Sequence, residues 1–200
     1  IGSSGSQTSA GTCGSGNSAQ AWNNGTTGKR GASLNFDGSD DYVSNFTSSI
    51  SPIGSRSICA WIKPSNTNRM GIIGTRPASA SQGFAFIINR NNVGNLTYFH
   101  TGGSVLEIAA GISSGVWQHV CLTYDTAIST VKLYKNGLLL GKNSSFSTEA
   151  SSSFNGVIGG EQGDFSTVFN GQIDEVKIYN YALTPEQVKL DYNGGAVRFE

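Results

Sequence analysis

Short apolar alternations separated by turn-forming residues run through the chain from Ala32 onward, and they constrain the fold more than any other feature. Gly, Asn, Asp and Ser interrupt these segments at intervals of roughly ten residues, the spacing typical of β-sandwiches and jelly rolls. The 27 glycines among 200 residues suit many short strands joined by tight turns. The sequence therefore predicts an all-β fold, an antiparallel two-sheet jelly-roll sandwich with one short C-terminal helix.

The clearest local signal is a hairpin between Val131 and Leu140. Asn136-Gly137 supplies the two residues with positive φ that a type I′ turn requires. The expected strands are Ser33–Phe36, Tyr42–Val43, Ser57–Lys63, Gly71–Gly74, Phe84–Asn89, Leu96–His100, Val105–Ala109, Trp117–Tyr124, Thr130–Lys135, Leu138–Gly141, Phe154–Ile158 and Gly171–Tyr179.

One helix start is well marked. Thr184 is suited to the N-cap, Pro185 to the first helical position and Gln187 to the third position of a capping box. The turn Asn193-Gly194-Gly195 is expected to end this helix. A single short helix after the last long strand cannot build a βαβ crossover, so α/β architectures are excluded.

Residues 1–31 form a separate region by composition, a Gly/Ser/Asn-rich N-terminal arm or linker before the sandwich of residues 32–200. If this arm is ordered, the sandwich surface, a neighbouring molecule or a bond through Cys13 must hold it. The sequence does not choose among these three. No basic-then-apolar signal stands at the N-terminus, so we expect a mature or trimmed fragment.

The charge balance argues against nucleic acid and anionic membranes as partners. Thirteen basic and thirteen acidic side chains cancel, so no long-range field steers the chain to nucleic acid or to an anionic membrane. No run of 18 or more apolar residues occurs, so no membrane insertion is expected.

Four segments carry a family resemblance. Gly28–Val43, Ser57–Pro64, Trp117–Asp125 and Phe169–Thr184 resemble, in this order, laminin-G-like jelly-roll domains of the concanavalin A-like lectin/glucanase superfamily. The resemblance covers roughly Gly28–Tyr192. It implies the fold more than the activity, since this fold hosts lectins, adhesion modules and glycan-active enzymes.

Two cysteines are similar to the disulfide pair of pentraxins. The resemblance implies a bond between Cys59 and Cys121, and each also lies among alternating apolar residues. A disulfide implies an oxidising compartment, so we expect an extracellular, secreted or cell-surface protein. Cys13 is then a spare thiol, free or intermolecular.

A second pentraxin-like segment suggests calcium. Ile158–Asp164 resembles the pentraxin calcium loop, in which Glu161, Gln162 and Asp164 would be oxygen ligands. Gly163 interrupts the pattern, and the later Glu and Gln of the second pentraxin calcium have no counterpart. This loop is therefore the less favoured metal site.

Asp174 is the other metal candidate. It shares strand parity with Val176 and Ile178, so an unbulged strand would point its carboxylate into the core. Related sandwiches bind a structural calcium between the N-terminal and final strands, which would pair Asp174 with Asp37 or Asp40. The alternative is a carboxylate bonded to backbone amides at a bulge. At most one calcium ion is expected, with a structural role.

Catalysis is not expected. His100 and His119 lack a Cys or His at metal-ligand spacing, and packing explains His119 in the family's Trp-x-His strand. No G-x-S-x-G nucleophile motif occurs. The closely spaced acids of the superfamily's glycan hydrolases are also missing, because Asp174 and Glu175 are adjacent and would face opposite sides.

Sugar binding would need exposed aromatic rings beside amides and carboxylates. The candidate ligand-binding residues are Trp22, Tyr98, Phe99, Phe165 and Tyr181. The leading hypothesis is a non-catalytic carbohydrate-binding or adhesive module whose partner is a glycan or an extracellular protein. The alternatives are a structural subunit of an extracellular filament or surface layer, self-associating through the arm or Cys13, and a glycan-active enzyme.

Overall fold

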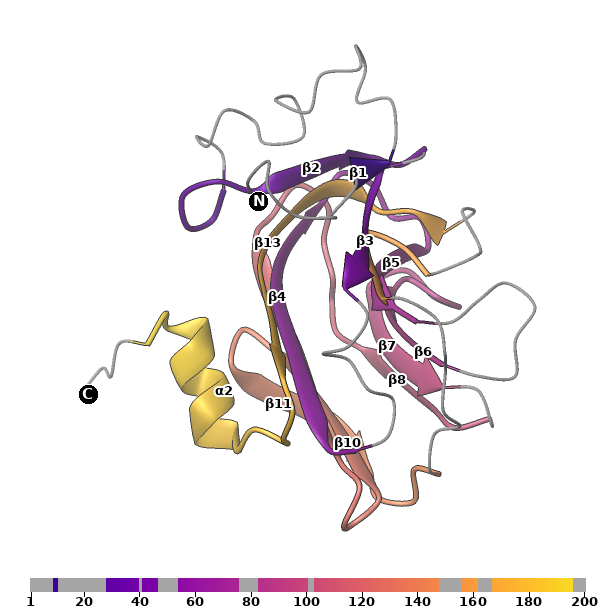
Figure 1. The fold of residues 1–200 in the computed structure, drawn as a ribbon, viewed down its shortest axis with the longest axis vertical. Coiled ribbons are helices and arrows are strands. Elements are labelled where there is room, and N and C mark those ends of the chain that lie inside the picture. Colours follow the sequence, from indigo (N-terminus) through magenta and orange to yellow (C-terminus); the bar gives the residue numbers. More distant parts are fainter. Residues whose placement is uncertain are drawn as a thin grey trace.

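Two antiparallel β-sheets pack face to face, and one short helix lies outside the second sheet (Figure 1). The structure is a computed structural model that describes residues 9–10, 28–39, 41–46, 54–75, 83–100, 103–147, 156–161 and 167–195. Within these residues no helix is long and apolar enough to cross a membrane.

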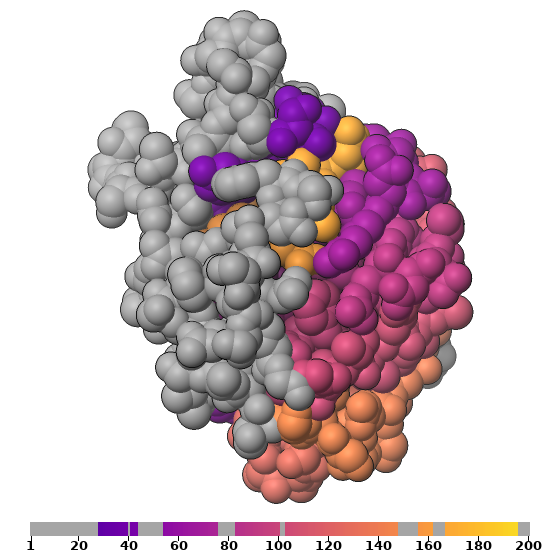
Figure 2. Space-filling model, turned by 90° about the vertical axis from the view of Figure 1, so that its right-hand side faces the viewer, coloured from indigo at the N-terminus to yellow at the C-terminus, as the bar shows by residue number. Residues whose placement is uncertain are grey.

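The first sheet has seven strands in the order β1-β3-β12-β5-β6-β7-β8. Their bounds are Ser9–Ala10 (β1), Tyr42–Phe46 (β3), Gly156–Ile158 (β12), Met70–Gly74 (β5), Phe84–Ile88 (β6), Asn95–His100 (β7) and Val105–Ala109 (β8). The outer side of this sheet is seen in Figure 2, where β5 to β8 follow one another in magenta and pink.

The second sheet has six strands in the order β11-β10-β9-β4-β13-β2. Their bounds are Leu138–Asn143 (β11), Thr130–Lys135 (β10), Gln118–Asp125 (β9), Arg56–Pro64 (β4), Asn170–Tyr179 (β13) and Leu34–Asp37 (β2). The helix α2 spans Pro185–Tyr192 and follows β13 directly (Figure 1). The jelly-roll sandwich predicted from the sequence is confirmed.

The main core fills the space between the sheets. Alternate residues of each strand point to opposite faces, so every second side chain of β4 and β9 enters this core. Its buried members from these two strands are Ile58, Ala60, Ile62, Val120, Leu122 and Tyr124. The facing sheet contributes Met70, Ile72, Ile73, Phe84, Phe86, Ile88, Leu96 and Tyr98.

The two best-marked local predictions are confirmed. Asn136 and Gly137 both have positive φ, at 50° and 78°, as a type I′ hairpin turn requires. Thr184 caps α2, since its hydroxyl accepts a hydrogen bond from the Gln187 backbone, and the Gln187 side chain accepts one in return from the Thr184 backbone.

One strand was not expected from the sequence. Ser9–Ala10 lies within the Gly/Ser-rich arm and pairs with β3, with Ser9 opposite Val43 and Ala10 opposite Tyr42. Of the three anchors considered for the arm, the sandwich surface therefore holds at least these two residues. The division between residues 31 and 32 remains a prediction. Cys13 lies outside the described residues.

Candidate functional site

The outer face of the six-stranded sheet lies under α2, and we call it the helix-covered face (Figure 1). Residues that alternate with core positions point to it. They are Cys59 and Trp61 from β4, His119 and Cys121 from β9, Tyr134 from β10, and Lys177 and Tyr179 from β13. Polar and aromatic side chains thus occupy this face, whereas the centre of the opposite face is apolar.

A disulfide joins neighbouring strands on this face. Cys59 and Cys121 lie opposite each other in the β4–β9 register, and their sulfur atoms are 1.99 Å apart. Both cysteines are fully buried in a small apolar cluster with Tyr134, Leu183 and Val188, through which the connection to α2 and the helix itself pack onto the sheet. The bond that the pentraxin resemblance implied is confirmed.

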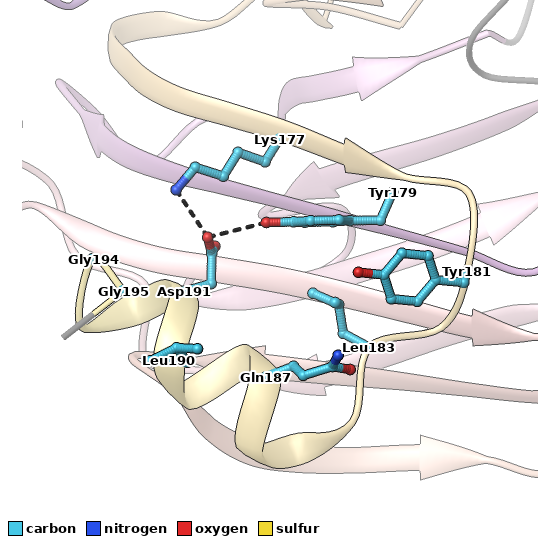
Figure 3. A pocket seen from close by; sticks show the side chains of 9 residues that line it. All are labelled: Lys177, Tyr179, Tyr181, Leu183, Gln187, Leu190, Asp191, Gly194 and Gly195. Atoms are coloured by element: carbon cyan, nitrogen blue, oxygen red, sulfur yellow. Dashed lines mark hydrogen bonds and ion pairs between the residues drawn. The ribbon is translucent and has the colours of Figure 1, made fainter. Parts of the chain in front are cut away.

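Asp191 connects α2 to two strands. Its Oδ2 accepts a hydrogen bond from His119 Nε2 at 3.0 Å. Its Oδ1 accepts one from Lys177 Nζ at 2.8 Å and one from the Tyr179 hydroxyl at 3.3 Å (Figure 3). The buried carboxylate thus receives three donors from β9 and β13.

These contacts set the protonation states in the group. Burial alone would raise the pKa of Asp191, but the hydrogen bonds from His119 and Lys177 outweigh it and lower this pKa from 3.8 to about 2. Burial would likewise lower the pKa of Lys177, yet the contacts with Asp191 and Glu175 raise it. Burial and the charge of Asp191 raise the pKa of Tyr179, so at neutral pH its phenol is a donor.

An aromatic stack lies beside this network. The Trp61 ring stacks on Tyr192 with centroids 5.5 Å apart and meets His119 edge-on at 5.4 Å. Lys29 Nζ lies 4.6 Å from the centroid of the Trp61 ring, in cation–π contact. The Arg30 guanidinium donates to the Tyr192 carbonyl at 3.2 Å, so the segment before β2 fastens the end of α2.

A pocket of about 340 Å³ opens between the end of β13 and α2 (Figure 3). Its lining residues are Lys177, Tyr179, Tyr181, Leu183, Gln187, Leu190, Asp191, Gly194 and Gly195. Tyr181 lies on the connection between strand and helix and is 46% exposed. Its ring meets Tyr179 edge-on, with centroids 5.8 Å apart. The pocket combines an accessible aromatic ring with an amide, an ammonium and a carboxylate.

The predicted ligand-binding aromatics separate into three groups. Tyr181 lines the pocket, whereas Tyr98 is fully buried in the main core and Phe99 is buried on the outer side of the other sheet, with the Arg90 guanidinium 4.6 Å from the centroid of its ring. The interpretation of Tyr98 and Phe99 as exposed platforms is wrong, because β7 is an interior strand whose two faces are both covered. Trp22 and Phe165 lie outside the described residues.

Asp174 does not point into the core. Ile173 is a core residue, so Asp174 faces the other side with its register partner Trp61. A bulge follows, at which Glu175 takes a φ of 49°, and parity is then shifted by one residue. The Asp174 carboxylate accepts hydrogen bonds from the backbone N–H groups of Arg30 and Glu175, both at 2.8 Å. The backbone-bonded alternative is the one observed.

The predicted calcium pair of Asp174 with Asp37 does not fit this arrangement. Asp37 is opposite Asn170 in the β13–β2 register, four positions from Asp174, which is about 13 Å at the rise of an extended strand. Ligands of one calcium lie within about 2.6 Å of the ion, so these two carboxylates cannot share it. Asp40 lies outside the described residues.

The acidic loop is described only at its first residue. Glu161 is buried and accepts a hydrogen bond from the Arg69 guanidinium at 2.6 Å, so a cationic partner already compensates its charge. Gln162 and Asp164 lie outside the described residues, and their role as ligands stays a prediction.

Cys59, His119 and Asp191 offer ligand atoms that lie within 4.8 Å of one another. A metal would need the cysteine as a thiolate, but the Cys59 sulfur is bonded to Cys121. In the disulfide form this group therefore works as the hydrogen-bonded network around Asp191 rather than as a metal centre.

Sequence reasoning missed Lys177, Gln187 and Asp191. A usable signal existed, because Gln187 and Asp191 are four positions apart and such residues share one helix face. The position of Lys177 carried no such signal, because the bulge at Glu175 decides which side of the sheet it faces.

Comparison with known proteins gives one family and several similar folds. The family model described as "Concanavalin A-like lectin/glucanases superfamily" matches residues 37–189. The C-reactive protein of Xenopus laevis is 28% identical over an alignment that covers 40% of this chain and 40% of that protein. The chain thus matches less than half the length of this curated relative.

Solved structures share the sandwich. A heptameric SAP-like pentraxin from Limulus polyphemus has a TM-score of 0.60 at 20% identity, covering 76% of this chain and 75% of its own. Domain 4 of an extracellular arabinanase from Geobacillus stearothermophilus, in complex with arabinotriose, has a TM-score of 0.65 at 22% identity. This alignment covers 84% of this chain and 79% of that domain. The CBM40 of a Ruminococcus gnavus sialidase, bound to α2,3-sialyllactose, has a TM-score of 0.58 at 19% identity. This alignment covers 70% of this chain and 83% of that chain. These likenesses establish the fold.

Proposed function

Because the chain belongs to the Concanavalin A-like lectin/glucanases superfamily, we propose that it is a non-catalytic carbohydrate-binding module of a secreted or cell-surface protein. The observation that carries this proposal is the half-exposed ring of Tyr181 in a pocket that also presents Gln187 and Lys177. An aromatic ring covers the apolar face of a sugar, and a few placed polar groups orient its hydroxyls.

The electrostatics of the pocket support binding without catalysis. Glycoside hydrolysis uses two carboxyl groups, one of which must carry a proton at working pH through a raised pKa. Asp191 is the only carboxyl group that lines the described pocket, and its pKa is lowered to about 2. Its oxygens already accept three hydrogen bonds. It therefore acts as a fixed anion that holds Lys177 and α2.

The similar structures support the ligand class. Two of them were solved with arabinotriose and with sialyllactose, so sandwiches of this shape accept short oligosaccharides. We extend this class of ligand to the Tyr181 pocket. The disulfide supports an oxidising, extracellular location.

The pocket needs no calcium in this proposal. Its polar groups already have charge partners within the protein, and neither acidic group predicted to bind calcium lines it. Sugar binding should therefore survive treatment with a chelator. Glu161 follows β12 of the other sheet, so a calcium ion bound to it would be separate from the pocket.

The test is a glycan array followed by calorimetry with the best oligosaccharide. Tyr181→Ala should weaken binding about tenfold or more, since an aromatic contact of about 1.4 kcal/mol corresponds to that factor. Tyr181→Phe keeps the ring and should retain most of the affinity. Leu138→Ala is the matched control, because Leu138 is an exposed apolar side chain of the β10–β11 hairpin outside the pocket.

Two results would contradict the proposal. Undiminished binding by Tyr181→Ala would place the sugar elsewhere on the molecule. Ordered, concentration-dependent polymers in light scattering, with no glycan bound, would favour a structural subunit instead. Part of the arm already pairs within its own chain, through Ser9–Ala10 and β3, which leaves less of it to hold a neighbour.

A further inference from the structure

We propose, resting on the function above, that the Tyr181 pocket selects uncharged sugars and discriminates against sugars that carry a carboxylate. The pocket contains charged groups, but each of them is compensated inside the protein. Selection follows from where these charges point and from what an acidic ligand would have to displace.

Lys177 is the cation of the pocket with which an acidic sugar would form an ion pair. Its Nζ donates to Asp191 Oδ1 at 2.8 Å and lies 3.2 Å from Glu175 Oε2, so two carboxylates surround one ammonium. The Lys177 and Glu175 side chains are each about one-third exposed, whereas Asp191 is buried. A ligand carboxylate would either displace one of these carboxylates from Lys177 or take its third N–H, and in both cases it would approach like charge.

Asp191 is compensated in turn. It receives Lys177 and Tyr179 on one oxygen and His119 on the other, so it offers no strong site for a cationic ligand. The other lining residues, Tyr179, Tyr181, Leu183, Gln187, Leu190, Gly194 and Gly195, carry no charge at neutral pH.

Among the residues that the structure describes, Arg30 is a further cation near the pocket. Its guanidinium lies against Gly194, where an added Cβ would come within 1.8 Å of Nη1. It donates to the Tyr192 carbonyl at the C-terminus of α2, where the helix dipole places partial negative charge. Arg30 is thus directed at the helix end.

The pocket therefore offers directional hydrogen bonds without a net electrostatic field. Gln187, the Tyr181 hydroxyl and the ammonium of Lys177 can bond to sugar hydroxyls, whereas a carboxylate brought near Glu175 and Asp191 meets like charge. About 340 Å³ is near the lower end of small-ligand sites, roughly 300–1,000 Å³, so one or two sugar rings suit it.

The test compares matched ligand pairs by calorimetry at physiological ionic strength. The pairs are lactose with 3′-sialyllactose, and galactotriose with trigalacturonic acid. We expect the neutral member to bind about tenfold more tightly where either member of a pair binds. Equal or tighter binding of the acidic member, at a site removed by Tyr181→Ala, would overturn this inference while leaving the proposed function intact.

A charge variant supplies a gain-of-binding test. Glu175→Gln leaves Lys177 with one carboxylate partner, so the ratio of acidic to neutral affinity should rise by about threefold to tenfold. Glu107→Gln is the control, because it removes the same charge from β8 of the other sheet. An unchanged ratio in Glu175→Gln would refute the compensation argument. Failure of every sugar to bind to the intact protein would instead refute the proposed function.

Discussion

The two faces of the six-stranded sheet are held by different kinds of interaction. The inner face carries apolar side chains at its centre and packs against a second sheet, so burial is its main source of stability. At its edge the buried Arg56 guanidinium donates to the Tyr98 hydroxyl and lies over the ring of Phe84. The helix-covered face has a single two-turn helix above it and adds a disulfide, a shared carboxylate and an aromatic stack. Such a short helix cannot hold its place by burying apolar surface alone. Because it covers only part of the face, it also leaves room for a pocket.

The inner face should show the largest loss of stability on substitution. Ile62 is fully buried on β4, and Ile62→Ala should lower the free energy of unfolding by about 2–5 kcal/mol through lost burial and a cavity. Urea denaturation measures this, with exposed Lys142→Ala as the control expected within about 0.5 kcal/mol. A loss below 1 kcal/mol would mean that the inner face relaxes around the cavity and that the two faces of the sheet differ less than expected.

The helix-covered face should instead respond to pH. Asp191→Asn should cost about 2 kcal/mol at pH 7, because lowering a carboxyl pKa from 3.8 to about 2 is worth about that much. The folded pKa is depressed, so this contribution is present above pH 4 and is lost as the pH falls from about 4 to about 2. Denaturation curves of both proteins should therefore converge in that range. A gap that stays constant down to pH 2.5 would show that shape, rather than charge, explains the loss.

The helix start should give the smallest effect. Thr184→Ala removes the N-cap acceptor of α2 and should cost about 1 kcal/mol, whereas Thr184→Ser keeps the hydroxyl and should cost little. Gln187 is both the capping-box partner and a pocket residue, so sugar affinity should fall together with stability. Unchanged sugar affinity in Thr184→Ala would show that the pocket does not depend on the N-cap.

The parts of this fold that the sequence predicted are those with local signals. Strand periodicity located nearly every strand within about two residues, Asn136-Gly137 marked the hairpin, and Thr184 marked the helix start. The disulfide came from a family resemblance. The strand at Ser9–Ala10 was missed, because two small residues among Gly and Ser carry no apolar alternation.

The site was harder to predict because it depends on which elements cover which face. Tyr98 and Tyr181 have the same side chain, yet one is in the core and the other is on the surface, since β7 lies inside a sheet and Tyr181 follows the last strand. Parity places Asp174 in the core only if β13 is regular, and the positive φ at Glu175 shows that it is not, so the alternative of a backbone-bonded carboxylate at a bulge is the one observed. Asp191 lies twelve residues or more from each residue that it contacts on the sheet.

The extra residue in β13 marks a place where the strand tolerates a change of length that its regular parts do not. Between Asp174 and Lys177, β13 contains one more residue than β4 contains between their partners Trp61 and Cys59. Deleting Glu175 would leave Asp174, Val176 and Lys177 in regular alternation, so Lys177 and Tyr179 would keep their register partners and stay on the helix-covered face. A deletion in the regular part of β13, at Ile178 for example, would instead shift the parity of the residues beyond it and exchange their faces. Sandwiches of this kind that lack a residue at the position of Glu175 are therefore expected to keep the β13 side chains of the pocket on the helix-covered face.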